Sequence, residues 1–333
     1  MSKAVRSAPP SISIVIPNGR AFPTPLVEQI TPQLYKGDEL IVVQNRSGGG
    51  KERWTGLREN EARPVTDTAS SAPYDMAGNH QFLRLLSSES GAARARNVGW
   101  RAASNCWIMF LDDDVCIEKN FVARMRDKAL SDGASVSTFR LRDYKVCDGG
   151  SIQRLISLDR GGDVRNTQSS PLILSEVWRY GAGAAMLVHR DLLYEIGGFK
   201  DRLGAGCKYG GAEDLEFLWH ASRHTAVEYD GTVTVSHPVA NQYAEVGRKF
   251  RQYGRAIACL SGTAKGISSL RTVFNYCFHL LVGTARATRG TDRISLHLRS
   301  LAFLAVEETI RVYLVSLITR RRTGALCDRC CLR

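Results

Sequence analysis

The apolar positions of the first 240 residues form short continuous runs separated by longer periodic stretches. Short runs of β-branched and aliphatic residues bounded by Pro, Gly, Asn or Asp are typical of buried central strands. Such runs lie at residues 11–16, 39–43, 82–86 and 107–111. Stretches that suit helices lie between them, at residues 23–34 and 92–103. The alternation predicts repeated β-α-β units, and hence an α/β domain with a sheet covered by helices on both faces.

The pattern changes beyond residue 134. Further strands are predicted at residues 135–141, 185–189 and 233–237. The last of these follows Asp230-Gly231, a dipeptide typical of tight turns. A short helix is predicted over residues 190–196 and ends at Gly197-Gly198, because glycine readily takes the left-handed conformation at a helix C-terminus.

Another helix is predicted over residues 212–220, with Glu213 and Asp214 in its first turn. Acidic side chains are favourable there because they complement the helix dipole. Glu213 and Asp214 are thus explained either by stabilisation of the helix or by a catalytic role, and both interpretations stay open.

Polarity and length divide the chain into an α/β domain, residues 1–240, and a mainly helical region, residues 241–333. The first domain divides again at about residue 130, into halves of residues 11–130 and 131–240. Residues 47–51 and 59–80 are polar or glycine-rich and are predicted to be loops.

The net charge of +12 belongs almost wholly to the C-terminal region. Residues 241–333 contain 14 Arg and 2 Lys against 5 acidic residues, a net charge of +11, which leaves +1 for residues 1–240. The near-neutral α/β domain and the absence of an RNA-binding motif with interleaved aromatic residues lead us to expect no nucleic-acid partner.

Two apolar segments lie in the basic region, at residues 273–285 and 301–318. The first is too short for a membrane span and the second carries charges near its middle. In the second, one helical face gathers Phe303, Val306, Ile310, Tyr313, Leu314 and Leu317. The segment ends in Arg320-Arg321-Arg322. Two interpretations remain open: a helix packed on the domain, or an interfacial helix that arginines hold to anionic lipid.

Cysteine usage and the N-terminus suggest a cytoplasmic protein, peripheral at the inner face of the membrane if the interfacial interpretation holds. The nine cysteines are an odd number spread along the chain, which favours reduced thiols over a disulfide framework. No secretory signal pattern is found at the start. Cys327, Cys330 and Cys331 have half of a zinc-site spacing without a second half, and we assign them no role.

Three adjacent carboxylates, Asp112, Asp113 and Asp114, follow the apolar run at residues 107–111. Ligands of open α/β sheets bind where such strands end. The three charges repel one another unless solvent, a cation or hydrogen bonds relieve them. Oxygen ligands of this kind suit Mg²⁺ or Mn²⁺. The cluster is therefore a divalent-metal site or a solvated acidic turn.

Four segments together resemble the family 2 glycosyltransferases of the GT-A fold over about residues 11–240. Residues 12–17 resemble the opening strand that ends in Ile-Pro, and residues 91–102, with Ala95-Arg96-Asn97, resemble the Ala-Arg-Asn-x-Gly helix. Residues 111–114 resemble the Asp-x-Asp metal motif. Gly197-Gly198-Phe199 and Glu213-Asp214 resemble the motifs on the acceptor side. The resemblance implies a Rossmann-like, mostly parallel sheet with helices on both faces.

The resemblance also implies a chemistry, inverting transfer of a sugar from a nucleotide-sugar donor to an acceptor hydroxyl. A divalent cation, Mn²⁺ or Mg²⁺, would neutralise the diphosphate leaving group. Asp114 would bind this cation and Asp112 the donor's ribose or the metal, while Asp113 is the variable middle position. Asp214 would be the general base that takes the acceptor's proton. The acceptor itself, whether a glycan, a lipid-linked or a small molecule, stays undefined.

By the same resemblance, the remaining positions fall into three groups. The metal ligands would be Asp112, Asp114 and His237, the last beyond a strand end where simple packing is the alternative. The donor-binding residues would be Pro17, Gln44, Asn45, Arg96, Asn97, Asp112 and Asp113. The residues on the acceptor side would be Gly197, Gly198, Phe199, Glu213 and Glu216.

Two departures from the family pattern affect the donor. Pro17 is followed by Asn18-Gly19-Arg20, where the family often has Thr-Tyr-Asn. The second strand ends in Gln44-Asn45, where an Asp frequently contacts the base. Glutamine both donates and accepts hydrogen bonds, so it can still read the edge of a pyrimidine. The sequence does not define the nucleotide or the sugar.

Parts of the sequence also fit two other functions. Residues 108–115 also fit the nucleophile motif of haloacid-dehalogenase-like phosphatases, but that motif usually opens its domain, whereas two strands precede it here. The other is a protein that binds membrane or RNA through its basic tail, with an inert α/β domain. Metal-type and base-type carboxylates on one near-neutral domain argue against an inert role.

Overall fold

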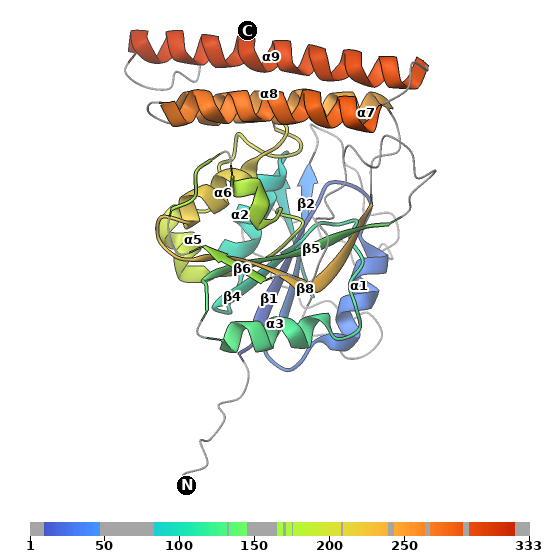
Figure 1. Ribbon diagram of the computed structural model, residues 1–333. Helices are drawn as coiled ribbons and strands as arrows, with labels where there is room; N and C mark the ends of the chain where they lie inside the picture. The colour runs from blue at the N-terminus through green and yellow to red at the C-terminus, as the bar shows by residue number, and fades with distance from the viewer. Residues whose placement is uncertain are drawn as a thin grey trace.

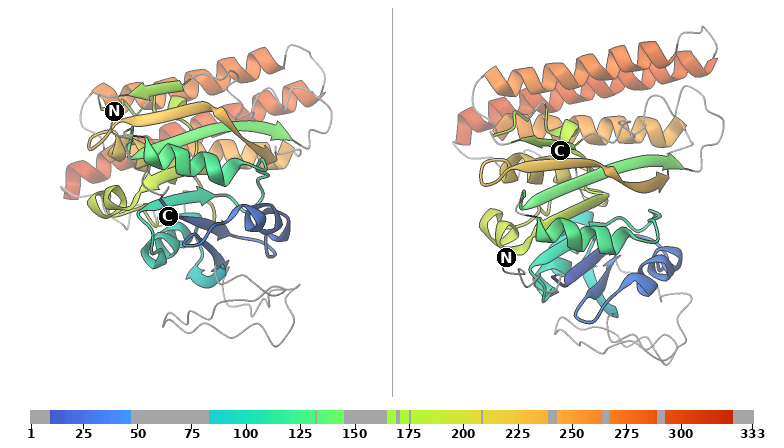
Figure 2. Two further views of the ribbon diagram at one scale, coloured as in Figure 1. Left: turned by 90° about the horizontal axis from the view of Figure 1, so that it is seen from below. Right: turned by 60° about the horizontal axis from the view of Figure 1, so that its bottom comes forward.

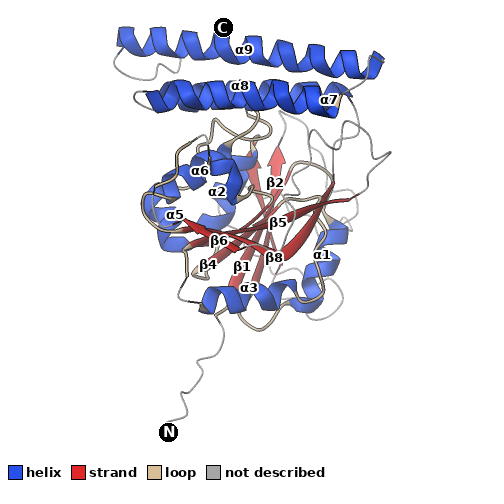
Figure 3. Cartoon of the chain, viewed as in Figure 1, coloured by secondary structure: helices blue, strands red, loops and turns tan. Residues whose placement is uncertain are grey.

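The computed structural model describes residues 10–46, 83–131, 133–144, 165–168, 171–174, 176–207, 209–238, 243–263, 267–288 and 293–323. Within these residues, eight strands form one sheet in the order β3-β2-β1-β4-β7-β5-β8-β6. The strands are β1 Ile12–Asn18, β2 Glu39–Arg46, β3 Leu83–Glu89, β4 Trp107–Leu111, β5 Val136–Tyr144, β6 Arg165–Gln168, β7 Ala185–His189 and β8 Val227–Pro238. Figures 1 and 3 show this sheet as the centre of the molecule.

The sheet is parallel on one side and mixed on the other. The pairs β2–β3, β1–β2, β1–β4 and β5–β8 are parallel, and the pairs β4–β7, β5–β7 and β6–β8 are antiparallel. The antiparallel strand β7 therefore lies beside the end of β4, where the three aspartates begin. The β4–β7 pair thus places residues 107–111 beside residues 185–189.

Helices cover both faces of the sheet, which agrees with the continuous burial of β1, β4 and β7. The elements α1 Thr24–Ile30, η1 Thr31–Gln33 and α3 Phe121–Leu130 lie on one face. The elements α2 Ala92–Ala102, α5 Arg190–Ile196 and α6 Glu213–Ala221 lie on the other, with the short turn η3 Val177–Tyr180. Within β1, Ile14 and Ile16 pack in the core on the side of α1 and α3, and Val15 packs in the core on the side of α2, α5 and α6.

Three long helices form a separate layer on one side of the sheet domain (Figures 1 and 2). They are α7 Tyr243–Thr263, α8 Ile267–Ala287 and α9 Arg293–Thr323. They share small apolar cores of their own, one of which joins Val246 and Phe250 to Leu298 and Ala302. A further core joins α7 to the loop before α6, through Ala256 and Leu260 on the helix. Within the described residues, no helix is long and apolar enough to cross a membrane.

The predicted fold class is confirmed, since the structure is an α/β domain with helices on both faces of its sheet and a C-terminal helical region. β4, β7 and α5 have the predicted bounds. Gly197 ends α5 in the left-handed conformation, as predicted. The division of the chain at residue 240 stays a prediction, as does the boundary near residue 130. The loops predicted at residues 47–51 and 59–80 lie outside the described residues.

The turn predicted at Asp230-Gly231 is wrong. β8 runs through both residues as one strand, and its pairing with β5 shifts from Phe139↔Asp230 to Arg140↔Thr234. The residues between are accommodated in an irregularity of the strand rather than in a reversal of the chain. The side chain of Asp230 accepts hydrogen bonds from the backbone N–H and hydroxyl of Thr232, which stabilise this irregularity.

Candidate functional site

The aspartate cluster begins where β4 ends, beside β7. The backbone N–H of Asp112 donates to the carbonyl of Ala184 at 3.1 Å. Asp113 accepts a 3.0 Å hydrogen bond from the N–H of Gly19, which follows β1. Burial, together with the charges of Asp112 and Asp114, raises the pKa of Asp113 to about 6 against the opposing effect of this hydrogen bond. The three carboxylates therefore lie close enough to repel one another, as expected from the sequence.

Asp114 lies between two other segments of the chain. Its Oδ2 is 3.0 Å from Nη1 of Arg20, and its Oδ1 is 3.9 Å from Nε2 of His237. A pair of backbone hydrogen bonds between Cys116 and Ser236 holds the two strands in this register. The structure thus brings together two of the predicted metal ligands, Asp114 and His237, which are far apart in the sequence.

Arg96 on α2 joins the aspartate cluster to the start of α6. Its Nη2 is 2.7 Å from Oδ1 of Asp112, and its Nη1 is 2.7 Å from Oε1 of Glu213. The side chain is only 3% exposed. A guanidinium is suited to this task because its donors diverge in a rigid fork. Burial and the charge of Asp214 raise the pKa of Glu213, although Arg96 opposes this.

Asp214 is buried at the N-terminal end of α6, with both of its oxygens oriented by backbone groups. Oδ2 accepts from the N–H of Gly183 at 2.8 Å, and Oδ1 accepts from the N–H of Leu215 at 2.8 Å. A Cβ atom at Gly183 would lie 2.9 Å from Cβ of Asp214, so only glycine fits in this position. Each carboxylate oxygen keeps a second acceptor direction for a ligand.

The side chain of Asn97 forms hydrogen bonds with the backbone of the segment 197–199. Its Nδ2 donates to the carbonyl of Phe199 at 2.7 Å, and its Oδ1 accepts from the N–H of the same residue at 2.9 Å. Phe199 is itself buried and stacks on Phe217. Gly198 must stay small, because a Cβ atom would lie 2.5 Å from Oδ1 of Asn97. The geometry therefore gives Asn97, Gly198 and Phe199 a supporting role, and direct contact with a ligand stays a prediction.

The residues predicted to bind the donor at the end of β2 also form hydrogen bonds with the segments that follow β1 and β3. Oε1 of Gln44 accepts from Nδ2 of Asn18 at 2.9 Å, and its Nε2 donates to the carbonyl of Arg20 at 3.3 Å. Oδ1 of Asn45 accepts from the N–H of Gly91 at 2.6 Å. Pro17 is buried within β1. The structure thus gathers these residues at the edge where β1 and β2 end, as predicted.

Glu216 differs from the other predicted residues on the acceptor side. It is buried on α6, and its Oε1 lies 3.2 Å from Nε2 of His220 one turn further on. Its Oε2 has no hydrogen-bond partner among the described residues. These contacts do not join it to Arg96 or to the aspartate cluster.

Tyr253 of α7 lies close to these carboxylates, although no pattern in the sequence indicates it. Its ring lies beside Gly211 of the loop before α6. Burial, followed by the charges of Asp214, Glu213 and Asp112, raises the pKa of its phenol, although 37% of the residue stays exposed. No motif or periodicity in the sequence predicts that the basic region lies near these carboxylates. The proximity results from the packing of α7 on the loop before α6.

The cluster suits a divalent cation in its chemistry, with Asp114 and His237 as the protein ligands within closest reach. One oxygen of Asp112 already contacts Arg96. No group of three or more His, Cys, Asp or Glu side chains within the described ranges is arranged to hold a metal ion by itself. Mg²⁺ in particular is commonly held by one or two carboxylates together with phosphate oxygens of a substrate. The residues therefore fit a cation that arrives with a phosphorylated ligand.

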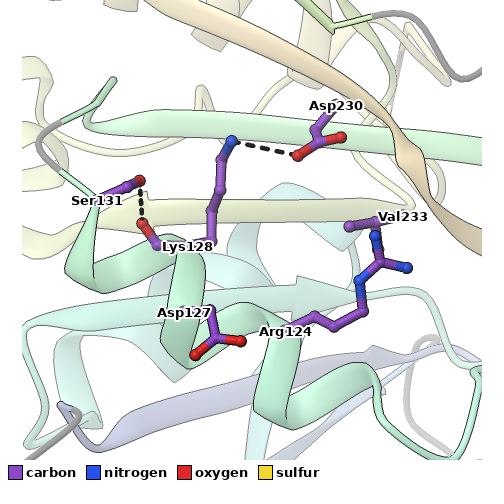
Figure 4. Close-up of a pocket in the computed structure, with 6 residues that line it drawn as sticks. All are labelled: Arg124, Asp127, Lys128, Ser131, Asp230 and Val233. Carbon is purple, nitrogen blue, oxygen red and sulfur yellow. Dashed lines mark hydrogen bonds and ion pairs between the residues drawn. The ribbon is translucent and has the colours of Figure 1, made fainter.

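A pocket elsewhere contains none of the predicted site residues. Figure 4 shows Lys128 of α3 directed at Asp230 of β8 and Arg124 of α3 beside Val233 of β8. Lys128 lies 3.3 Å from Asp230 and also pairs with Glu228. Its basic groups are thus held by acidic and polar neighbours, which identifies a structural ion-pair cluster that joins α3 to β8.

Comparison with known proteins gives consistent results for the α/β part of the chain. Residues 65–197 match the model of the family described as Glycosyl transferase family 2. A pre-mycofactocin glycosyltransferase of Mycobacterium tuberculosis is 23% identical over 229 residues, which cover 67% of this chain and 47% of that protein. An uncharacterized glycosyltransferase of Haemophilus influenzae is 31% identical over 107 residues, which cover 32% of this chain and 30% of that protein. The chain thus spans less than half the length of these relatives.

Among solved structures, the mannosyltransferase PcManGT of Pyrobaculum calidifontis, in complex with GDP-Man and Mn²⁺, is 15% identical with a TM-score of 0.48. The match covers 97% of this chain and 91% of that one.

Proposed function

We propose that the chain is a member of glycosyl transferase family 2, whose model matches residues 65–197, and that it transfers a sugar from a nucleotide-sugar donor to an acceptor hydroxyl with inversion at the anomeric carbon. The observation that carries the proposal is the buried contact of Arg96 with both Asp112 and Glu213. This contact links a carboxylate cluster suited to a donor and its cation to a second pair of carboxylates suited to an acceptor. Curated relatives named as glycosyltransferases support the same reaction class.

On the donor side, Asp114 and His237 would hold a divalent cation together with the diphosphate oxygens. When bound, this cation supplies Lewis-acid stabilisation of the leaving diphosphate. Asp112, oriented by Arg96, would accept hydrogen bonds from the donor's ribose through its second oxygen. Gln44 and Asn45 lie at the neighbouring strand end, where they would contact the base.

On the acceptor side, Asp214 would act as the general base. Its carboxylate is held in one orientation by the N–H groups of Gly183 and Leu215. A fixed orientation matters because a base must meet the hydroxyl proton at hydrogen-bond distance as the bond forms. Glu213 would support it through Arg96, and the phenol of Tyr253 would line the same side of the site.

We expect Asp114→Ala to remove most of the Mn²⁺-dependent binding of a nucleoside diphosphate. The loss should be at least about tenfold, because even groups that only orient metal ligands are worth that much. Titration of UDP and GDP with and without Mn²⁺ measures the effect. Asp127→Ala, which removes an exposed acid of α3, is the control. Unchanged Mn²⁺-dependent affinity in folded Asp114→Ala would contradict the assignment.

We further propose that the C-terminal helices contact an anionic membrane surface. Most of the large apolar side chains that stay exposed among the described residues lie on α8 and α9. They are Leu270, Phe274, Phe278, Leu281, Leu296, Phe303, Leu304, Ile310, Leu314, Val315 and Ile318. Of the face predicted for residues 301–318, Tyr313 is buried, whereas Phe303, Ile310 and Leu314 are exposed. An apolar surface within a region of net charge +11 suits acidic lipid.

The double variant Phe274→Ser/Phe278→Ser should lose binding to anionic vesicles by about 100-fold. Each ring contributes about 1.5–3 kcal/mol when it leaves water, and these two are 65% and 50% exposed. Sedimentation with phosphatidylserine-containing and purely phosphatidylcholine vesicles measures the loss, and Leu130→Ser on α3 is the control. Replacement of Arg320–Arg322 by glutamine should weaken binding to the anionic vesicles alone. Equal binding of wild-type protein to both vesicles, or dimerisation through this surface instead, would refute the proposal.

A further inference from the structure

Arg20 is the one residue of the turn after β1 whose side chain reaches the aspartate cluster, with Nη1 3.0 Å from Oδ2 of Asp114. The backbone of the turn is held on several sides. Nδ2 of Asn18 and Nε2 of Gln44 both donate to the carbonyl of Arg20, and the N–H of Gly19 donates to Asp113. Asn18 is completely buried. The fixed backbone keeps the base of the Arg20 side chain beside the cluster.

The side chain of Arg20 is 70% exposed, so water can replace its contact with Asp114. It is surrounded by negative charge from Asp114, Asp113 and Glu245 of α7. An exposed ion pair of this kind contributes little free energy and breaks readily. This contrasts with Arg96, whose side chain is enclosed and bound to two carboxylates. The cluster therefore has one enclosed arginine at Asp112 and one exposed arginine at Asp114.

A cation that takes Asp114 must compete with the guanidinium that already pairs with this carboxylate. Once displaced, Arg20 would be repelled by the cation and attracted by any phosphate oxygens beside it. A guanidinium binds phosphate well, because its parallel N–H donors match two phosphate oxygens. The same side chain can thus oppose the binding of a cation alone and favour the binding of a cation with a diphosphate.

We propose that Arg20 exchanges partners, leaving Asp114 for the donor's diphosphate when a divalent cation binds Asp114. The inference rests on the proposed function and adds a regulatory consequence to it. Arg20 makes the site disfavour a bare cation and favour the cation together with the donor. No covalent step is involved, and Arg20 acts as a binding residue for the donor.

The test measures two affinities that should change in opposite directions. In Arg20→Ala, Mn²⁺ alone should bind more tightly, by at most about fivefold, which is the range of an exposed ion pair. UDP, GDP or inorganic pyrophosphate at saturating Mn²⁺ should bind more weakly, by about tenfold, because a charge-assisted hydrogen bond is lost. Electron paramagnetic resonance of free Mn²⁺ reports the first affinity, and calorimetry reports the second. Arg20→Lys keeps the charge without the fork and should lie between wild type and Arg20→Ala.

Arg94→Ala is the matched control, because Arg94 forms a 3.0 Å ion pair with Glu89 outside the cluster. It should change neither affinity. If Arg20→Ala leaves both affinities unchanged, or moves them in the same direction, partner exchange is wrong while the proposed function stands. If wild-type protein binds neither Mn²⁺ nor any of the three phosphate ligands, the proposed function fails first and the inference falls with it.

Discussion

Asp214→Asn should lose turnover by about 10²- to 10⁴-fold, the usual contribution of a positioned general base. Asparagine keeps the size of the side chain but lacks the basic lone pair that takes the acceptor's proton. Donor affinity should stay near that of wild type, because the change affects the attack on the donor and not the donor complex. Steady-state transfer and donor titration, measured on the same preparation, separate the two.

This variant also disturbs a hydrogen bond, which the experiment must account for. Asparagine can accept from only one of the N–H groups of Gly183 and Leu215, and its amide faces the other. We expect a loss of about 1–3 kcal/mol of stability for the unmatched buried donor. Assays well below the melting temperature remove this effect. Glu216→Gln is the control on the same helix, and a comparable loss of turnover in that variant would show that the base has been misassigned.

Arg96→Met should lower the free energy of unfolding by about 3–5 kcal/mol. That is the usual cost of removing one partner from a buried ion pair and leaving its charge uncompensated. Here two carboxylates, Asp112 and Glu213, lose their partner. Urea denaturation followed by circular dichroism measures the change. Arg96→Lys should lose less stability than Arg96→Met, because the ammonium keeps the positive charge. It should still be less stable than wild type, because one ammonium cannot bridge both carboxylates as the guanidinium does.

A second substitution makes this prediction more specific. In Arg96→Met/Glu213→Gln, one of the two unpaired charges is removed, so part of the lost stability should return. If the double variant is no more stable than Arg96→Met, the coupling of Arg96 to Glu213 contributes little. Arg101→Met, on the same helix but exposed, should change stability by about 0.5 kcal/mol or less.

Where the sequence predicted the fold well, local signals agreed with tertiary packing. The run Trp107–Leu111 is apolar, bounded and buried, and α5 has a glycine at the position where its left-handed end requires one. The prediction failed at Asp230-Gly231, because its turn signal was overridden by the pairing of β8 with β5 on both sides of the dipeptide. Residues 241–333 were predicted to be mainly helical, but the bounds of α7 within them were not predicted.

The site was predicted as separate motifs and not as an arrangement. Asp112, Arg96 and Glu213 could each be named from a local pattern, but their buried contact depends on how three elements pack. Arg20 was recognised only as a departure from the family pattern. Tyr253 could not be found, since a residue of α7 enters the site only through the loop against which that helix packs.

The packing of α7 on Gly210 and Gly211 has a consequence for the engineering of this protein and for its divergence. A Cβ atom at Gly210 would lie 2.5 Å from the side chain of Gln252, and one at Gly211 would lie 3.6 Å from the ring of Tyr253. Chimeras that exchange the C-terminal helices between relatives would therefore rebuild the loop that leads into Glu213-Asp214. We expect such exchanges to alter the acceptors taken, so that the tail and the acceptor are inherited together.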